Sequence, residues 1–97
     1  MKLEIAPKET EIKSNWDDAK LYCFSLNIDG KVGWRLPSID ELREIYKSEN
    51  DFEQRWYWSS TEFTGNYAWF QTMSNGYQNY CKKNHGSHYV RAIRSIP

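Results

Sequence analysis

Hydrophobic and polar positions along the chain follow two different periods. In the first half, apolar residues recur every three or four positions in two stretches, which predicts two helices. After Trp56, apolar and polar residues alternate as they do in half-buried β-strands. A short alternating stretch at residues 2–5, ended by Pro7, predicts one further strand, and residues 8–14 are expected to form a charged connection. A strand, two helices and several antiparallel strands make an α+β fold.

The first predicted helix has a single apolar stripe and is followed by a turn at residues 27–30. The stripe has helical spacing and consists of Trp16, Ala19, Cys23 and Leu26. Ser14 or Asn15 stands where an N-cap residue is expected. Asp17 and Asp18 follow in the first turn, where negative charge is favourable because that end of the helix dipole is positive.

The second predicted helix begins at Ser38, directly after a short extended segment. Pro37 disfavours helical backbone at Leu36, so residues 34–36 are expected to be extended. Ser38 and Glu41 have the spacing of a capping box, in which each side chain bonds the backbone N–H of the other residue. The buried face of this helix is predicted to consist of Leu42, Ile45 and Tyr46.

Four strands are predicted in the second half of the chain. They cover residues 57–61, 67–73, 77–82 and 89–96. The second and third strands are joined by Ser74-Asn75-Gly76, which is a typical hairpin sequence. Residues 84–87 are expected to form a loop before the last strand.

Four sequence motifs follow one another in a characteristic order. They are Trp16-Asp17-Asp18-Ala19 with Cys23, then Gly33-Trp34-Arg35-Leu36-Pro37-Ser38 leading into Glu41-Leu42, then Tyr57-Trp58-Ser59-Ser60-Thr61, and finally Tyr89-Val90-Arg91-Ala92-Ile93-Arg94. This order resembles the Lcl C-terminal-like domain family, a branch of the C-type lectin fold related to the formylglycine-generating enzymes. The resemblance covers roughly residues 14–95. It implies a C-type lectin-like fold, with two helices packed on a small, mostly antiparallel sheet, adjacent first and last strands, and residues 1–97 in a single domain.

The resemblance also implies that the motif residues build the scaffold. Arg91 and Arg94 match the arginines that close the family's pattern. The large motif residues expected to be buried in one core are Trp16, Trp34, Trp58 and Leu42. A ligand would then be selected by the residues between the motifs, at 63–67 and 75–89.

A bacterial or bacteriophage origin and a role in binding are further implications of the resemblance. Family members are often domains of larger surface proteins, and related proteins of the fold bind variable ligands through diversified C-terminal strands and loops. No hydrophobic segment of an export signal follows Met1. If Met1 is the natural start, we expect a cytoplasmic protein of a bacterium or a phage-infected cell, with a place in the virion as the alternative.

Composition and charge narrow the classes of partner. The 97 residues support one domain with one core, which five Trp, seven Tyr and four Phe can fill. No apolar stretch approaches the length of a membrane span, so no membrane partner is expected. Residues 1–62 carry 13 acids and nine Lys or Arg, a net charge of −4, whereas residues 63–97 carry no acid and four bases, a net charge of +4. The simplest interpretation is that the two halves neutralise each other.

Few residues have the pattern of a metal or catalytic site. The Glu-Pro-Asn and Gln-Pro-Asp motifs of calcium-dependent sugar binding are missing, so that activity is not expected. Cys23 and Cys81 are 58 positions apart, unlike the close cysteine pair of the formylglycine-generating enzymes, and both are expected to be free thiols, with Cys23 buried. Zinc bound by Cys81, His85 and His88 is the less favoured alternative to no metal and no cofactor. No base is fixed beside a nucleophile, so no catalytic residue is assigned and an enzyme is not expected.

The remaining candidate is a surface rich in Tyr, Asn and His between the C-terminal motifs. It consists of Asn66, Tyr67, Tyr77, Gln78, Asn79, Tyr80, Lys82, Lys83, His85 and His88. This is the composition of protein-binding paratopes, in which Tyr gives contact area at low entropic cost and Asn adapts its hydrogen bonds. The members expected to project from one face, with the two lysines at its rim, are Tyr77, Asn79, Tyr80 and His85.

The function that fits best is a non-catalytic binding module, a bacterial or phage-encoded protein that binds another protein and inhibits or modulates it. A virion or cell-surface receptor-binding component is the first alternative. Nucleic-acid binding is the second, and in it bases would stack on Tyr77, Tyr80 and Tyr89. The phosphates would be neutralised by the four bases of the C-terminal half, namely Lys82, Lys83, Arg91 and Arg94.

Overall fold

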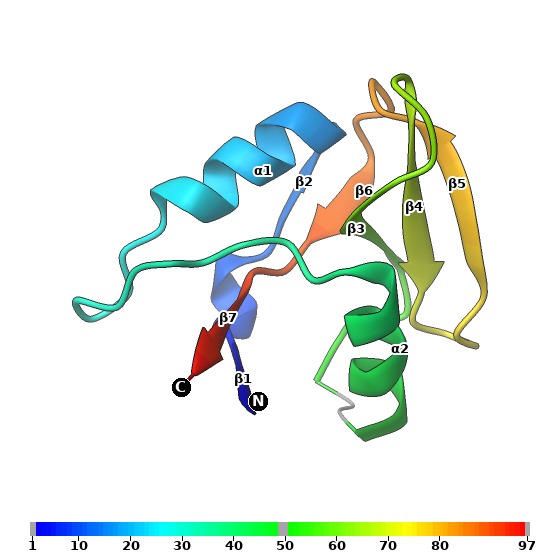
Figure 1. The fold of residues 1–97 in the computed structure, drawn as a ribbon. Helices are drawn as coiled ribbons and strands as arrows, with labels where there is room; N and C mark the ends of the chain where they lie inside the picture. The colour runs from blue at the N-terminus through cyan, green and yellow to red at the C-terminus, as the bar shows by residue number, and fades with distance from the viewer. Residues whose placement is uncertain (1, 49–50, 97) are drawn as a thin grey trace.

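A computed structural model describes residues 2–48 and 51–96 of the chain. Its elements are two short strands, a 3₁₀ helix and two α-helices in the first half of the chain, and strands throughout the second half (Figure 1). In chain order they are β1 (Lys2–Ile5), the 3₁₀ helix η1 (Lys8–Thr10), β2 (Ile12–Ser14), α1 (Trp16–Ser25), α2 (Ile39–Ser48), β3 (Trp56–Glu62), β4 (Tyr67–Thr72), β5 (Gln78–Lys82), β6 (His88–Val90) and β7 (Ile93–Ile96). The predicted α+β plan is confirmed. No helix in the described part of the chain is long and apolar enough to cross a membrane.

Two sheets organise the strands. The larger has five strands in the order β2-β6-β3-β4-β5, and all neighbours are antiparallel except β3 and β6. The smaller pairs β1 with β7, so the first and last strands lie side by side, as predicted (Figure 1). Because β5 is the last strand of the larger sheet, no strand of residues 2–48 or 51–96 pairs with its outer side.

Helix α1 begins at the predicted position. Of the two candidate N-cap residues, Asn15 is the cap, since its side-chain oxygen accepts the backbone N–H of Asp18 at 2.8 Å. Trp16, Ala19 and Cys23 are buried against the sheet. The Trp16 ring also donates its Nε1–H to the carbonyl of Ser59 on β3 at 2.8 Å, which fixes the helix to the central strand.

The predicted capping box starts helix α2. The Glu41 N–H donates to Ser38 Oγ at 3.1 Å, and the Ser38 N–H donates to Glu41 Oε1 at 2.7 Å. Leu42 and Ile45 form the buried face. Tyr46, which was predicted to belong to that face, is 39% exposed. Its ring lies against the hairpin turn at Gly76, so close that a Cβ at position 76 would clash with it.

The core consists of two clusters, one on each face of the larger sheet. Trp58 and Phe70 are cross-strand partners and face α1, together with Trp16 and Trp34. Tyr57 and its partner Gln71 face α2, because neighbouring residues of a strand point to opposite faces. The expectation of a single core is therefore wrong for Leu42, which is buried in the second cluster.

Two further expectations about the strands are corrected. Residues 8–14 were predicted as a connection, but they contain η1 and β2, and β2 forms one edge of the sheet beside β6. Residues 89–96 were predicted as one strand, but Arg91 and Ala92 divide them into β6 and β7. At this point the chain passes from the larger sheet to the smaller, and the Ala92 carbonyl accepts the N–H of Ala6 at 2.9 Å.

Candidate binding surface

Four aromatic side chains gather on β4 and β5, on the face of the sheet that packs against α2 but beyond the part that the helix covers. This cluster, called here the aromatic shelf, consists of Phe63, Tyr67, Trp69 and Tyr80. Tyr80 is its centre: it stacks on Phe63 with 3.9 Å between ring centroids and meets the Trp69 ring at 5.4 Å. Even so, Phe63 remains 48% exposed and Tyr80 38% exposed. The shelf is thus a preassembled aromatic surface in contact with solvent.

Strand register explains why the shelf is open. Trp69 and Tyr80 are cross-strand partners, and the next pair on the same face is Gln71 with Gln78. That second pair lies under α2, since Gln71 Nε2 donates to the Leu42 carbonyl and Gln78 Nε2 to the Ile39 carbonyl, both at 3.1 Å. Gln71 and Gln78 mark the limit of the area that α2 covers. Trp69 and Tyr80, one step along the strands, make no such bond to α2 among the described residues.

Lys82 extends the shelf along β5. It is the cross-strand partner of Tyr67, so its side chain is on the same face as Tyr80. Lys82 is exposed, and it makes no salt bridge with any described residue. A positive charge therefore stands beside the aromatic rings.

Tyr77 and Asn79 lie on the opposite face of the sheet from Tyr80. Asn79 pairs with Phe70, whose ring faces α1, and Asn79 Nδ2 donates to the Tyr77 hydroxyl at 2.8 Å. Tyr77 is 55% exposed. The expectation of one face for these tyrosines is wrong, because adjacent positions on an edge strand alternate between faces.

His88 is buried rather than part of a surface. It is 1% exposed and lies among the rings of Trp56, Trp58 and Phe70, with centroid distances between 4.5 and 5.4 Å. Burial lowers the pKa of His88 to about 4, and the nearby His85 acts in the same direction. The imidazole is therefore neutral at pH 7. Its inclusion in the contact surface is corrected, whereas His85 is exposed beside it.

Cys81 and His88 form a close pair of neutral groups. Cys81 Sγ and His88 Nε2 are 3.0 Å apart, and burial raises the pKa of the Cys81 thiol to about 11. The pair has neither the thiolate nor the imidazolium of an activated nucleophile. Burial also raises the pKa of Cys23 to about 12, and both cysteines are free thiols. Within residues 2–48 and 51–96, no three His, Cys, Asp or Glu side chains are placed to hold a metal ion.

Lys83 and Gln78 were predicted to belong to the contact surface, but their side chains bond other parts of the protein. Lys83 Nζ bonds Glu62 at 2.6 Å and the Gly65 carbonyl at 3.0 Å, and it lies 4.2 Å from the centre of the Trp16 ring. These contacts join the loop after β3 to the start of α1. Asn66 is exposed, and its carbonyl accepts the Lys83 N–H.

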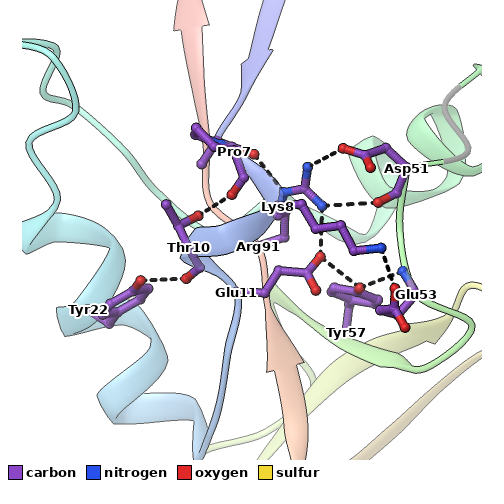
Figure 2. A network of polar contacts seen from close by, with 10 residues as sticks. Pro7, Lys8, Thr10, Glu11, Tyr22, Asp51, Glu53, Tyr57 and Arg91 are labelled. Atoms are coloured by element: carbon purple, nitrogen blue, oxygen red, sulfur yellow. Dashed lines mark hydrogen bonds and ion pairs between the residues drawn. The ribbon is translucent and has the colours of Figure 1, made fainter.

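Arg91 is the centre of a buried polar network, shown in Figure 2. Its guanidinium donates to the Ala6 carbonyl at 2.6 Å, to Glu11 at 2.7 Å and to Asp51 at 2.8 Å. The Tyr57 hydroxyl donates to the same Glu11 carboxylate at 2.8 Å. Burial and the negative charge of Glu11 raise the pKa of Tyr57. The network joins the N-terminal segment to the loop before β3 and to the end of β6, which is a structural role.

A second group of exposed apolar residues lies on the outer side of α1 and the loop that follows. Leu21, Phe24 and Val32 are all largely exposed, and Phe24 reaches 82%. A groove of about 560 Å³ lies beside Leu21 and Phe24, with Trp34 and Leu36 in its wall. Sequence analysis missed this group because the expected stripe of α1 accounted for the residues on its other side.

The shelf itself was partly predicted. Tyr67 and Tyr80 belong to it, and the predicted Lys82 lies beside it. Phe63 falls within residues 63–67, which were expected to select a ligand, but it was not named as a surface residue, and Trp69 was missed. The signal for Trp69 was present in the sequence: a hairpin turn centred on residues 74–75 places position 69 opposite position 80. Phe63 had no such signal, because it lies beyond β3 and reaches Tyr80 only through the loop at residues 63–66.

Comparison with known proteins identifies the family to which the chain belongs. No curated protein matches the sequence. The family model described as the Lcl C-terminal domain matches residues 4–94, which is nearly the whole chain. The matched segment contains both helices and both sheets apart from their terminal residues. The chain therefore belongs to the Lcl C-terminal domain family.

Proposed function

We propose that this protein is a non-catalytic binding module, bacterial or phage-encoded, that binds another protein on the aromatic shelf and thereby inhibits or modulates it. The observation that carries the proposal is the exposed stack of Phe63 and Tyr80 with Trp69 beside them. Exposed apolar patches of this kind mark interaction sites, and Tyr and Trp are the residues that contribute most to protein interfaces.

The geometry of the shelf supports a protein partner. Its rings are already in contact with one another, so little side-chain entropy is lost when a partner covers them. The neutral Cys81–His88 pair supports the non-catalytic part of the proposal. A cytoplasmic location, with the virion as the alternative, stays a prediction.

Nucleic-acid binding receives less support from the side-chain contacts. Of the four bases in residues 63–97, Arg91 is buried, Arg94 bonds Glu4 at 2.7 Å and Lys83 bonds Glu62. Lys82 alone among these four has no acidic partner within the described residues. A phosphate backbone needs several free cations, because each neutralised phosphate contributes separately to affinity.

The test compares two tyrosines on opposite faces of one strand segment. Tagged wild-type protein and the variants Tyr80→Ala and Tyr77→Ala are used to capture proteins from bacterial lysate, and the affinity of the captured partner is measured by titration. Tyr80→Ala should weaken binding by about 1–2 kcal/mol, which is roughly 5–30-fold. Tyr77→Ala is the comparison: Tyr77 is exposed too but lies on the other face, away from the shelf, so its loss should weaken affinity clearly less than Tyr80→Ala does.

Three outcomes contradict the proposal. Loss of capture in Tyr77→Ala and not in Tyr80→Ala moves the site to the α1 face of the sheet. Loss of capture in Phe24→Ser alone moves it to the groove beside α1. A steep decrease of affinity between 50 and 200 mM salt, on the order of a thousandfold, indicates nucleic acid.

A further inference from the structure

The hydrogen-bonding direction along β5 alternates, and the register shows which residues face the open side. The Thr72 N–H donates to the Tyr77 carbonyl at 2.8 Å, and the Lys83 N–H donates to the Asn66 carbonyl at 2.9 Å. The odd-numbered positions of β5 therefore bond β4, since alternate residues of an edge strand bond the same neighbour. The backbone groups of the even-numbered positions, Gln78, Tyr80 and Lys82, are directed away from β4.

Part of this open edge is already occupied by contacts within the chain. The Tyr80 N–H donates to Asn79 Oδ1 at 2.8 Å, and the Lys82 carbonyl accepts the His85 N–H at 3.0 Å. The register leaves the N–H and carbonyl of Gln78, the carbonyl of Tyr80 and the N–H of Lys82 directed to solvent. Such a row of groups can pair with an added strand.

Side chains on both faces of β5 are arranged to receive such a strand. The aromatic shelf extends from Tyr80 on one face, and Tyr77 with Asn79 lies on the other. Side chains of an added strand also alternate between faces. One set would lie beside the shelf and the other beside Tyr77, so pairing with the edge would order contacts on both faces at once.

The positive charge of Lys82 favours an added strand that carries an acidic side chain. Lys82 stands at the end of this edge with no salt bridge to a described residue, and residues 63–97 contain no acid. An acidic side chain opposite Lys82 would meet a positive charge that is not yet paired: Asp17 and Asp18 line the same open groove as Lys82, but neither forms a salt bridge with it. A basic strand would instead be repelled.

We propose that β5 pairs with an extended segment of the partner protein, which carries an apolar residue against the aromatic shelf and an acidic residue against Lys82. This rests on the proposed function, since it states how the partner of the shelf is bound. The occupant is a strand of another protein, and association of β5 with a second copy of this chain is a distinct outcome that the test separates.

The experiment uses a displayed library of randomised ten-residue peptides selected on the wild-type protein. Peptides with alternating apolar residues and an acidic end should be enriched. Two methylated forms of a selected peptide are then compared, one with its odd-numbered and one with its even-numbered backbone amides N-methylated. One form should lose affinity at least tenfold and the other little, because only every second amide faces β5. This measurement leaves the protein unchanged, so it does not depend on any variant folding.

Two substitutions at one position complete the test. Lys82→Pro removes an N–H that faces the open edge and no bond to β4, whereas Lys82→Ala keeps the N–H and removes the charge. Lys82→Ala should weaken peptide binding about threefold to tenfold, and Lys82→Pro at least tenfold beyond that. Circular dichroism and the unfolding midpoint check that both variants are folded.

Several results overturn the inference. The inference fails if the library is not enriched in any peptide, or if both methylated forms of a peptide lose affinity equally. It also fails if Lys82→Pro binds the peptide as tightly as Lys82→Ala does. A dimer of the free protein in sedimentation velocity that Lys82→Pro removes also overturns it, because the edge would then bind a second copy. If lysate capture depends on Tyr80 but not on the Lys82 N–H, the shelf binds its partner without strand pairing and the proposed function stands. If capture depends on neither, the proposed function fails as well.

Discussion

At the residue scale, the buried polar side chains of this small protein are either neutral or paired. His88 lies among the rings of Trp56, Trp58 and Phe70 and contacts an un-ionised thiol, whereas Arg91 keeps its charge and has two carboxylates and two carbonyls around it. The difference follows from chemistry. Imidazole can lose its proton when burial makes the charge costly, and guanidinium cannot.

His88 should make stability depend on pH. Its pKa in the folded protein is about 4, below its ordinary value of 6.5, so between these values the unfolded chain binds a proton that the folded protein does not. The free energy of unfolding should therefore fall as pH is lowered from about 6.5 to 4, by up to about 3 kcal/mol. Urea unfolding at a series of pH values measures this loss.

The control for this prediction is the neighbouring histidine. His88→Phe should flatten the dependence in that pH range, and His85→Gln should preserve most of it, because His85 is exposed. An unchanged slope in His88→Phe would show that other groups cause the loss. The burial of His88 was not predictable from its position, since the surrounding rings come from β3 and β4, which are 18 to 32 positions away.

At the element scale, local signals determined the helix starts and the hairpin, and contacts distant in sequence determined the rest. The capping box of α2 and the turn between β4 and β5 depend on residues a few positions apart, and both were predicted from sequence. β2 was missed because it is three residues long and is recognised only by its pairing with β6. The division of β6 from β7 depends on Arg91, whose partners lie 80 and 40 positions earlier.

Glu41 should contribute to stability in two separable ways. It accepts the Ser38 N–H at the start of α2 and receives two bonds from Arg35, at 2.7 and 2.8 Å, and the Arg35 bonds lower the pKa of Glu41 to about 2. Glu41→Ala removes both contributions and should lower the free energy of unfolding by about 1–2 kcal/mol. Glu41→Gln keeps the capping acceptor and should cost about half as much, since water screens the partly exposed Arg35. Chemical denaturation measures both, and equal losses would contradict the division.

At the scale of the whole molecule, the acidic first half neutralises most of the basic second half. Four salt bridges among the described residues cross between the halves: Lys83 with Glu62, Arg91 with both Glu11 and Asp51, and Arg94 with Glu4. The predicted neutralisation is thus confirmed for three of the four bases. Composition does not show which base is left without an acidic partner. That Lys82 is this base and lies beside an aromatic surface follows from the register of β5.

The distinction between buried and exposed side chains gives a prediction that compares Trp58 in the core with Phe24 on the outer side of α1. Trp58 is fully buried and its Nε1–H donates to the Ser14 carbonyl, so Trp58→Ala should cost on the order of 3–5 kcal/mol, which is much of the stability of a small domain. Phe24 is 82% exposed, so Phe24→Ser should change the free energy of unfolding by less than about 0.5 kcal/mol. Urea denaturation compares the two variants directly. A loss above about 1 kcal/mol in Phe24→Ser would mean that the outer side of α1 is covered in solution, and light scattering over a range of protein concentrations would then show whether a second copy covers it.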